Sequence, residues 1–339
     1  MFLLPNFIYL IQNVLFVALI ILMMLIFCNM LYKFLPFPTN HSRLVLQGKT
    51  VLITGASSVN YTQINFLLNL IYFYGAKLIL ASRSIDQLEK ICADLDIHNK
   101  YNANKGKLYR PTFLRLDLEE VANNEEKLEE FVKTIKLLLS NTNLNEPKLD
   151  VLINNAGQMA YGSGQRMNLN VLRRMINVNF LGHVAISQRL MDWIPDDGAI
   201  VLVSSIVGRV ALPYLGAYSA SKHAAQGFFD SLRAEDRPQL HILTASVGYV
   251  NTSLAINSLN EKGKTIGRTD PGQVAGMSPE YSAREIVAAV ERRETDLLLA
   301  PFIPRLLLSL RLATPNLLWF LLHRRFRNIY GNFGKCCED

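Results

Sequence analysis

The sequence has little cysteine and little charge. Its 339 residues include 4 cysteines and 19% charged side chains, whereas 50% of the residues are hydrophobic. So few cysteines exclude a small domain held together by disulfides, and the high apolar content excludes an intrinsically disordered chain. The 6 histidines lack the paired spacing of metal ligands, so we expect no metal site. No nucleic-acid-binding motif accompanies the net charge of +7, so we expect no nucleic-acid partner.

Much of the apolar surplus lies at the N-terminus. Residues 7–31 carry no charged side chain, and about 20 apolar residues suffice to span a bilayer as a helix. A cleaved signal peptide needs a positive start and small residues at its cleavage site, and this run has neither. We therefore expect residues 1–33 to form a transmembrane anchor, rather than a signal peptide or a buried core helix. Residues 34–48, which include two prolines, are the predicted linker.

The charge that flanks the anchor lies on its C-terminal side. Lys33, Arg43 and Lys49 follow the apolar run, and no Lys or Arg precedes it. Lys and Arg residues that flank a membrane span usually lie on its cytosolic side, so the part of the chain after the anchor is expected to face the cytosol.

A second apolar stretch lies near the C-terminus. Residues 302–322 mix leucine and phenylalanine with arginine and proline, which argues against a membrane-spanning helix, and a basic cluster follows at 323–327. This combination is typical of a segment that lies on an anionic membrane surface. A helix packed on the protein core fits equally well. We treat residues 301–339 as an apolar and basic C-terminal segment.

Between these stretches, short apolar runs alternate with longer helical ones. The helical stretches include 64–74 and 124–139, and the polar stretches 96–106 and 140–147 predict surface loops. Continuous apolar strands separated by helices imply a parallel sheet covered on both faces. We therefore predict an α/β fold with one doubly wound, Rossmann-type domain over residues 49–300. The expected strands are 49–54, 76–81, 113–116, 149–153, 199–203 and 242–247, with 297–300 as a seventh candidate.

The strongest chemical pattern combines Ser205, Tyr218 and Lys222. Tyr218 and Lys222 are spaced i, i+4 on a predicted helix and so face the same way. A phenol has a pKa near 10, and a neighbouring ammonium group is expected to lower that pKa and to make the phenol a better acid–base catalyst. Ser205 ends a predicted strand, where its hydroxyl would bind a substrate carbonyl oxygen beside Tyr218. The alternative, a chance Tyr-x-x-x-Lys on a surface helix, does not account for this serine.

Asparagines mark two further positions. Asn154 and Asn155 begin an Asn-Asn-Ala-Gly motif directly after a predicted strand. Strand ends in such a sheet border the ligand crevice, where these side chains either tie strands together or line a cofactor cleft. Asn179 lies on the following helix, where it either holds a water molecule near Lys222 or stabilises the helix.

Together these motifs resemble the short-chain dehydrogenase/reductase family, over residues 49–327. Thr-Gly-Ala-Ser-Ser at 54–58, Asp117-Leu118 and Gly-Tyr-Val-Asn-Thr at 248–252 belong to the same resemblance. The segments at 220–235 and downstream of Asn251 are most similar to the membrane-anchored branch that contains dehydrogenase/reductase members 7 and 7B. The resemblance implies NAD(P)(H), hydride transfer at a carbonyl or alcohol carbon, and often a homodimer or tetramer.

The resemblance also implies roles for individual residues. Tyr218 is then the acid/base, Lys222 binds the cofactor ribose and tunes Tyr218, and Asn179 supports the proton relay. Ser205 orients the substrate oxygen, so Ser205 and Tyr218 are the expected substrate contacts. The expected cofactor contacts are Thr54, Gly55, Ser57, Ser58, Ser82, Arg83, Asp117, Leu118, Asn155, Ala156, Gly157, Tyr218, Lys222, Gly248, Val250 and Thr252.

The end of the second predicted strand indicates the type of cofactor. An acidic residue there would bind the ribose 2′-hydroxyl of NAD, whereas an arginine accommodates the 2′-phosphate of NADP. This sequence has Ser82 and Arg83, which favour NADP(H) over NAD(H). Asp117 is expected to meet the adenine or, alternatively, to cap the helix that follows it.

The glycine-rich loop departs from the family pattern. Val59 and Tyr61 stand where the family's Thr-Gly-x-x-x-Gly-x-Gly has its later glycines. Glycine there lets the backbone approach the pyrophosphate, so these side chains should crowd the cofactor. One hypothesis is a misread gene model or alternative exon over residues 59–74, which recovery of the unchanged transcript would exclude. Val247 replaces a family proline, which we expect to be a milder change.

The predicted function is an NADP(H)-dependent oxidoreductase that acts on a lipid-, steroid- or retinoid-like substrate. The anchor and the C-terminal segment place the cleft near a bilayer, and the long loop 251–279 is expected to cover the substrate as a lid. We expect a single-pass protein of the endoplasmic reticulum, with the peroxisome as the alternative organelle. The alternative function is a membrane-tethered pseudoenzyme whose altered glycine-rich loop impairs catalysis.

Overall fold

The computed structural model divides the chain into two units, Met1–Ser42 and Arg43–Asp339. It describes residues 13–14, 16–18, 20–21, 23–24, 43–57, 61–101, 108–140, 147–252, 254–268 and 270–333. Most of the expected anchor at 1–33, and residues 34–42 of the expected linker, lie outside the described residues. Among the described helices, none combines the length and hydrophobicity that a membrane span requires.

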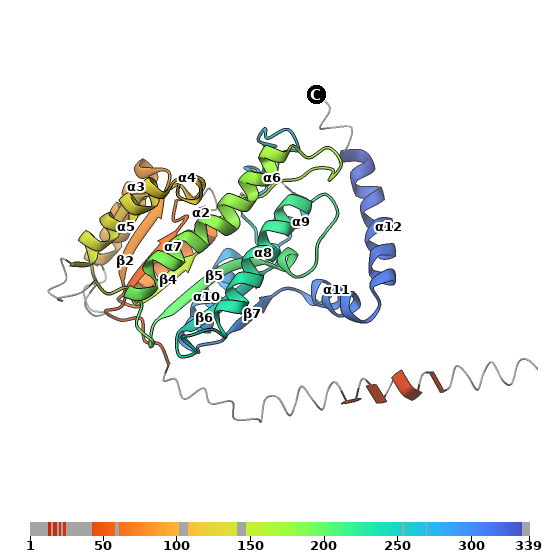
Figure 1. Ribbon diagram of the computed structural model, residues 1–339, viewed down its shortest axis with the longest axis horizontal. Helices are drawn as coiled ribbons and strands as arrows, with labels where there is room; N and C mark the ends of the chain where they lie inside the picture. Colours follow the sequence, from red (N-terminus) through yellow and green to blue (C-terminus); the bar gives the residue numbers. More distant parts are fainter. Residues whose placement is uncertain are drawn as a thin grey trace, which may run out of the picture. The chain divides into compact units, whose positions relative to one another are not determined.

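Seven parallel strands form a single sheet in the second unit, in the order β3-β2-β1-β4-β5-β6-β7 (Figure 1). The order reverses between β1 and β4, which is the point where ligands bind in sheets of this type. The predicted doubly wound α/β domain is therefore confirmed. The strands are β1 (Thr50–Thr54), β2 (Lys77–Ser82), β3 (Thr112–Arg115), β4 (Val151–Asn154), β5 (Ala199–Ser205), β6 (His241–Val247) and β7 (Asp296–Leu299).

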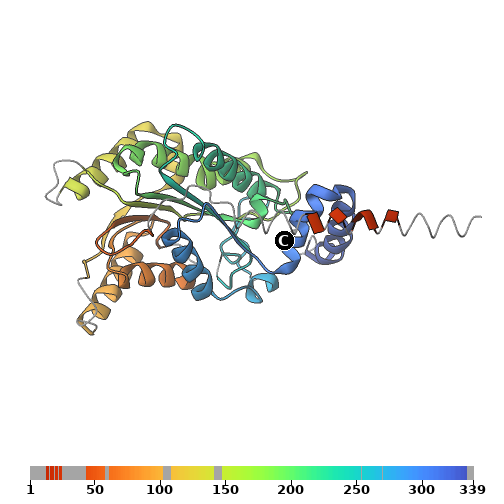
Figure 2. The same ribbon diagram turned by 90° about the horizontal axis from the view of Figure 1, so that it is seen from below.

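Helices cover both faces of the sheet (Figure 2). Successive strand residues point to opposite faces, so Ile53 belongs to one core cluster and Leu52 to the other. This two-sided burial explains the continuous apolar strands. One face packs against α2 (Tyr61–Phe73), α3 (Ile85–Tyr101) and α10 (Pro279–Glu291), and the other against α4 (Leu118–Asn123), α5 (Glu125–Ser140), α7 (Gly182–Leu190) and α8 (Gly216–Leu232).

The packing of helix α2 explains its apolar sequence. Ile64, Leu68 and Ile71 are at most 2% exposed and lie in the same core cluster as residues of α10. The helix begins at Tyr61, whereas Ser58 and Val59 lie outside the described residues. The predicted crowding at Val59 therefore stays a prediction, while the aliphatic run after it has a structural role.

The predicted loop at 96–106 is partly wrong, because α3 extends to Tyr101. No glycine or proline interrupts the chain before Gly106, so the helix continues through these polar residues. Residues 102–107 and 141–146 lie outside the described residues.

Most of the remaining elements surround the carboxyl ends of the strands. They are α6 (Leu169–Ile176), the π-helical turn η1 (Asn177–Leu181), the 3₁₀ turn η3 (Ile206–Gly208), α9 (Pro271–Val274), α11 (Phe302–Ala313) and α12 (Pro315–Phe333). The 3₁₀ turn η2 (Met191–Trp193) instead lies at the amino end of β4, where its Trp193 carbonyl accepts the Leu149 N–H at 3.0 Å. The last helix packs on the domain, because its Leu318 and Leu322 are buried in one cluster with Tyr218.

Candidate active site

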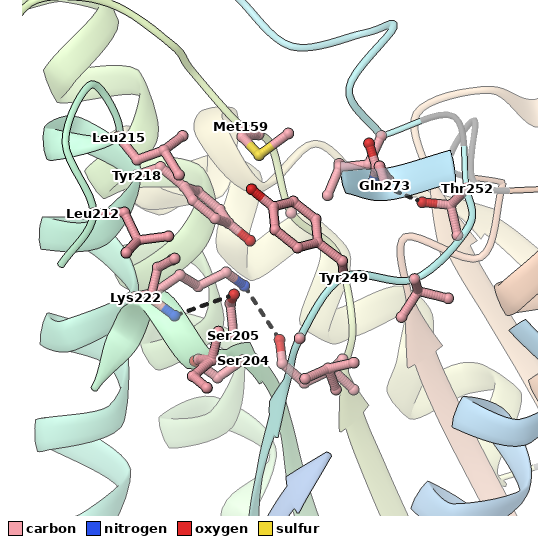
Figure 3. A pocket seen from close by; sticks show the side chains of 18 of the residues that line it. Met159, Ser204, Ser205, Leu212, Leu215, Tyr218, Lys222, Tyr249, Thr252 and Gln273 are labelled. Carbon is pink, nitrogen blue, oxygen red and sulfur yellow. Dashed lines mark hydrogen bonds between the residues drawn. The ribbon is translucent and has the colours of Figure 1, made fainter. Parts of the chain in front are cut away.

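A cleft runs along the carboxyl ends of the strands as two adjoining cavities of about 170 and 120 Å³. The two cavities share the lining residues Gly157, Met159 and Leu254. The larger cavity, which we call the outer cavity, is bordered by Arg83. The smaller one, the inner cavity, contains the predicted catalytic residues (Figure 3).

Ser205, Tyr218 and Lys222 meet at the inner cavity. Tyr218 and Lys222 project from the same side of α8, and Ser205 ends β5. The Ser205 hydroxyl accepts the Val207 N–H at 3.4 Å and lines the inner cavity together with Tyr218. The Lys222 ammonium donates to the Val203 carbonyl at 3.2 Å and lies 6.0 Å from the centre of the Tyr218 ring. The residues that the sequence groups by spacing are therefore neighbours in space.

Burial controls the protonation of both α8 residues. It raises the pKa of Tyr218 to about 12, although the Ser205 hydroxyl acts in the opposite direction. Burial also lowers the pKa of Lys222 to about 8. The prediction that Lys222 depresses the pKa of Tyr218 is thus wrong here, because removing the phenol from water disfavours its anion more strongly.

The loop after β4 is tied closely to β1. The Thr54 hydroxyl accepts the backbone N–H groups of Asn155 and Ala156 at 3.1 and 3.2 Å, and Asn155 Nδ2 donates to the Thr54 carbonyl at 3.2 Å. Gly55 has a φ of +68°, and a Cβ added there would lie 2.6 Å from Ala156 Cα. Only glycine permits this approach. Asn155 therefore ties two strands together and also lines the inner cavity.

Asn179 lies in the π-helical turn η1 and is fully buried. Its Nδ2 donates to the Gln158 carbonyl at 2.8 Å and to Ser221 Oγ at 2.9 Å, and its Oδ1 accepts the Gln158 N–H at 2.8 Å. The side chain thus fixes the loop beside Gly157 to α8. Its role in a proton relay stays a prediction.

The outer cavity gathers further predicted cofactor residues. The hydroxyls of Ser57 and Ser82 hydrogen-bond each other. Arg83 is exposed and forms no ion pair with any described residue. Asp117 caps α4 by accepting the Glu119 N–H at 2.9 Å and also lines the outer cavity, as do Leu118, Ala156 and Gly157. The capping alternative for Asp117 is therefore observed, while its contact with adenine stays a prediction. Ser58 lies outside the described residues.

The predicted lid lies against the inner cavity. Thr252 of the lid lines this cavity, as do Gly248 and Val250 directly before the lid. The Gly248 N–H donates to the Leu299 carbonyl at 2.7 Å. The Gln273 side chain makes both bonds: its Nε2 donates to the Thr252 hydroxyl at 3.0 Å, and its Oε1 accepts the Ala255 N–H at 2.8 Å. Gln273 thus cross-links the lid. Sequence reasoning did not single it out, because no local pattern marks it.

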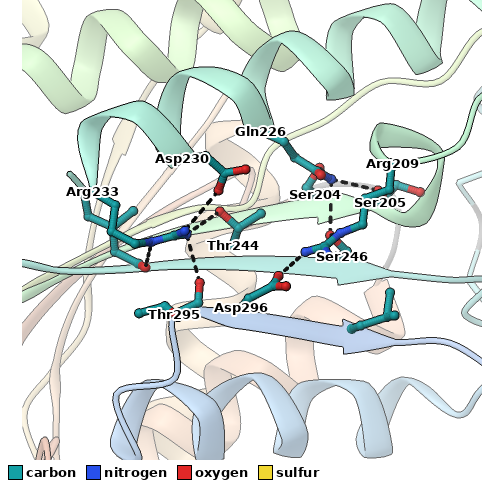
Figure 4. A network of polar contacts seen from close by, with 12 residues as sticks. Ser204, Ser205, Arg209, Gln226, Asp230, Arg233, Thr244, Ser246, Thr295 and Asp296 are labelled. Carbon is teal, nitrogen blue, oxygen red and sulfur yellow. Dashed lines mark hydrogen bonds and ion pairs between the residues drawn. The ribbon is translucent and has the colours of Figure 1, made fainter. Parts of the chain in front are cut away.

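A buried network behind Ser205 was also missed (Figure 4). Gln226 Nε2 lies 2.8 Å from Ser204 Oγ, 3.0 Å from the Ser205 carbonyl and 3.2 Å from Ser246 Oγ. Arg209 donates to the same Ser246 hydroxyl at 2.8 Å and pairs with Asp296 of β7. The i+4 spacing of Gln226 from Lys222 was a usable signal.

His183 is a second missed residue, four positions after Asn179. Its ring is buried, with Nε2 at 2.8 Å from the Ala156 carbonyl and Nδ1 at 3.2 Å from Asn154 Oδ1. Burial, and then the charge of Lys222, lower its pKa to about 3. A neutral imidazole therefore supports the Asn-Asn-Ala-Gly loop from behind.

Comparison with known proteins identifies the family. Residues 49–263 match the short chain dehydrogenase family model. A "Dehydrogenase/reductase SDR family protein 7-like" of Anopheles gambiae is 34% identical over 284 residues, which cover 83% of this chain and 84% of the relative. "Dehydrogenase/reductase SDR family member 7B" of Xenopus laevis is 31% identical over 283 residues, 83% of this chain and 82% of the relative.

Solved structures share the fold. A short chain dehydrogenase/reductase from Burkholderia phymatum in complex with NAD superposes with a TM-score of 0.64 and 20% identity, covering 81% of this chain and 96% of that one. An alcohol dehydrogenase from the archaeon Thermococcus sibiricus, complexed with 5-hydroxy-NADP, gives 0.59 and 22% over 75% of this chain and 96% of that one. The matched residues and relatives show that the chain belongs to the short-chain dehydrogenase/reductase family of oxidoreductases.

Proposed function

We propose that this protein is an NADP(H)-dependent oxidoreductase that reduces a carbonyl group, or oxidises the corresponding alcohol, on a hydrophobic substrate. One observation carries the proposal: the hydroxyls of Ser205 and Tyr218 and the ammonium of Lys222 meet in an apolar-walled cavity. This inner cavity adjoins the outer cavity, which is bordered by Arg83 directly after β2.

The cleft suits a nicotinamide dinucleotide. Lys222 is 3% exposed, and among the described residues its hydrogen-bond acceptor is the Val203 carbonyl. An ammonium has three N–H donors, so it has donors left for ribose hydroxyls. Gly157 leaves room beside it, since a Cβ added there would lie 3.5 Å from Lys222 Nζ. The bound cofactor would supply or accept the hydride.

The protein side chains then handle the proton. In the reductive direction, Ser205 donates a hydrogen bond to the substrate carbonyl oxygen, and Tyr218 delivers its phenolic proton to the same oxygen. A pKa of about 12 keeps Tyr218 protonated at neutral pH, as an acid requires. The charge of Lys222 stabilises the phenolate that forms. In the oxidative direction, the ionised form of Tyr218 would accept the proton of the alcohol.

Arg83 favours the phosphorylated cofactor. Its exposed guanidinium borders the outer cavity, and a planar guanidinium binds a phosphate through two parallel hydrogen bonds. A 2′-phosphate would therefore gain a charge-assisted contact that the 2′-hydroxyl of NAD cannot offer.

The inner cavity favours an apolar substrate. Met159, Leu212, Leu215 and Leu254 line it around the polar groups, and apolar walls with a few placed polar groups are typical of small-molecule sites. Together with the predicted membrane tether at residues 1–33, this supports a lipid-, steroid- or retinoid-like substrate that reaches the protein at the cytosolic face of the endoplasmic reticulum.

The test is a cofactor and substrate panel with the purified full chain in detergent. We expect NADPH oxidation with hydrophobic ketones, and at least tenfold lower kcat/KM with NADH. In Arg83→Ala, the KM for NADPH should rise about tenfold, because one charge-assisted contact of ~1.5 kcal/mol is lost, while the KM for NADH stays the same. If the wild-type chain neither binds nor oxidises NADPH, this result contradicts the proposal and supports the pseudoenzyme alternative.

A further inference from the structure

Helix α12 packs one face on the apolar cluster that borders the inner cavity. Leu318 and Leu322 are buried, and Phe326 packs against the same cluster, which also contains Tyr218 and Met159. Residues spaced i, i+4, i+8 share one face of a helix. This inner face therefore belongs to the same apolar cluster as Met159 and Tyr218, which line the inner cavity.

The other side of α12 is apolar as well. Leu317, Trp319, Phe320 and Leu321 are 47, 44, 60 and 42% exposed. A helix that packs on a core and otherwise meets water has polar residues on its outer side. Four large apolar side chains in its first two turns do not fit that arrangement.

Helix α11 adds to this exposed apolar area. Phe302, Ile303, Leu306 and Leu312 are 76, 57, 43 and 88% exposed, and α11 and α12 lie in contact as a helical pair (Figure 1). These four side chains and the four of α12 are called the C-terminal apolar surface. Apolar surface concentrated in this way is typical of a docking site.

The charge of the two helices indicates the partner. Between Phe302 and Phe333 the sequence has 5 arginines and no Asp or Glu. Arg324, Arg325 and Arg327 directly follow the apolar residues of α12. A second copy of this chain docked symmetrically would set these cations against each other, whereas an anionic lipid surface neutralises them.

We propose that the C-terminal apolar surface docks on an anionic membrane. Its leucine, phenylalanine and tryptophan side chains enter the interface between headgroups and acyl chains, and the exposed Arg324 and Arg327 lie at the level of the lipid phosphates. Since the inner face of α12 shares an apolar cluster with residues that line the inner cavity, a lipophilic substrate enters that cavity from the membrane side. This second part rests on the proposed function, whereas the docking itself does not.

Two native tryptophans allow a direct test of docking. The chain contains 2 tryptophans, Trp193 and Trp319, and only Trp319 belongs to the C-terminal apolar surface. The full-length Trp193→Phe and Trp319→Phe proteins are reconstituted in phosphatidylcholine–phosphatidylserine vesicles with brominated acyl chains. We expect at least twofold quenching of Trp319 emission relative to unbrominated vesicles, and no quenching of Trp193.

Equal Trp319 emission in brominated and unbrominated vesicles would overturn the docking proposal. A Trp319 signal that is unquenched but shifts to the blue as a dimer forms would do the same and would identify a second copy as the occupant. The double variant Phe320→Glu, Leu321→Glu should abolish the quenching without changing the melting temperature, because both side chains are exposed. Quenching that persists in this variant would contradict the assignment of the surface.

The entry route has its own readout. In vesicles, the double variant should lower kcat/KM about tenfold for a ketone dissolved in the membrane and leave kcat/KM unchanged for a water-soluble ketone. An unchanged value for both ketones, with quenching lost, would overturn entry from the membrane. If the wild-type chain reduces neither ketone, the proposed function fails, while the quenching result still decides docking.

Discussion

Tyr218, Lys222 and His183 share one physical cause for their protonation, which is removal from water. Burial keeps the phenol neutral, lowers the pKa of the ammonium to about 8 and lowers the pKa of the imidazole to about 3. At neutral pH the site therefore holds a protonated phenol, an ammonium cation and a neutral imidazole.

His183 makes stability depend on acid pH. Its pKa is about 6.5 in an unfolded chain and about 3 in the folded protein, so between these values the unfolded state binds a proton that the folded state does not. The free energy of unfolding should therefore fall as pH drops from 6.5 toward 3. Between pH 7.5 and pH 5, the wild type should lose ~2 kcal/mol more than His183→Gln.

Urea unfolding of both proteins at the two pH values, followed by fluorescence, measures this difference. Parallel losses of stability in the wild type and the variant would show that His183 becomes protonated without unfolding the protein, which contradicts the account.

Gln226 is predicted to position Ser205. Its amide lies close to the Ser205 carbonyl and to the hydroxyls of Ser204 and Ser246. Gln226→Met keeps the shape of the side chain but removes the donor, so kcat should fall about tenfold, equivalent to ~1.4 kcal/mol, with an unchanged Kd for NADPH. Gln273→Met is the matched control, because Gln273 bonds the lid, and its main effect should be on the substrate KM. Equal kcat in Gln226→Met and the wild type would exclude the positioning role.

The sequence was informative at residues whose partners are close along the chain. Tyr218 and Lys222 lie one helical turn apart, so their shared orientation followed from spacing alone. The pKa of Tyr218 was predicted in the wrong direction, because burial depends on residues far away in sequence. Likewise, the pair of Arg209 and Asp296 joins segments 87 positions apart, and no local pattern marks it.

Among the elements, the buried strands were predicted most accurately. Both faces of β1, β4 and β5 are covered, so their sequences are continuously apolar and bounded by polar residues. The extension of α3 to Tyr101 was missed, because the polar residues of its last turns have the composition of a surface loop. No glycine or proline marks where the helix ends. For α12 the sequence left two alternatives, and its buried residues show packing on the core.

The inner face of α12 gives a prediction at this scale. Leu322 is 3% exposed and lies in the same cluster as Tyr218, whereas its neighbour Leu321 is 42% exposed. Leu322→Ala should reduce the free energy of unfolding by ~2–5 kcal/mol, through lost burial and the cavity that remains. It should also raise the KM for hydrophobic ketones.

Leu321→Ala is the matched control and should change the free energy of unfolding by at most ~0.5 kcal/mol. Denaturant unfolding in detergent compares the two variants. Similar free energies of unfolding for both would contradict the packing of α12 on the cluster that contains Tyr218.

For the whole molecule, the apolar surplus and the positive charge have separable origins. Part of the surplus forms a two-sided core around seven strands, and part is exposed on α11 and α12 beside arginines. The N-terminal run remains a predicted anchor that lies mostly outside the described residues. Topology could be predicted because alternating strands and helices permit few arrangements, whereas the placement of the lid and of α12 depends on long-range packing.

Tyr218 is the proposed proton donor of an NADPH-dependent reduction. The most direct measurement compares the wild type and Tyr218→Phe for reduction of a hydrophobic ketone and for NADPH binding by fluorescence titration. We expect a loss of kcat of at least 1000-fold, or ~4 kcal/mol, with the Kd for NADPH within about twofold of the wild-type value. A Tyr218→Phe protein that retains wild-type kcat would contradict the account.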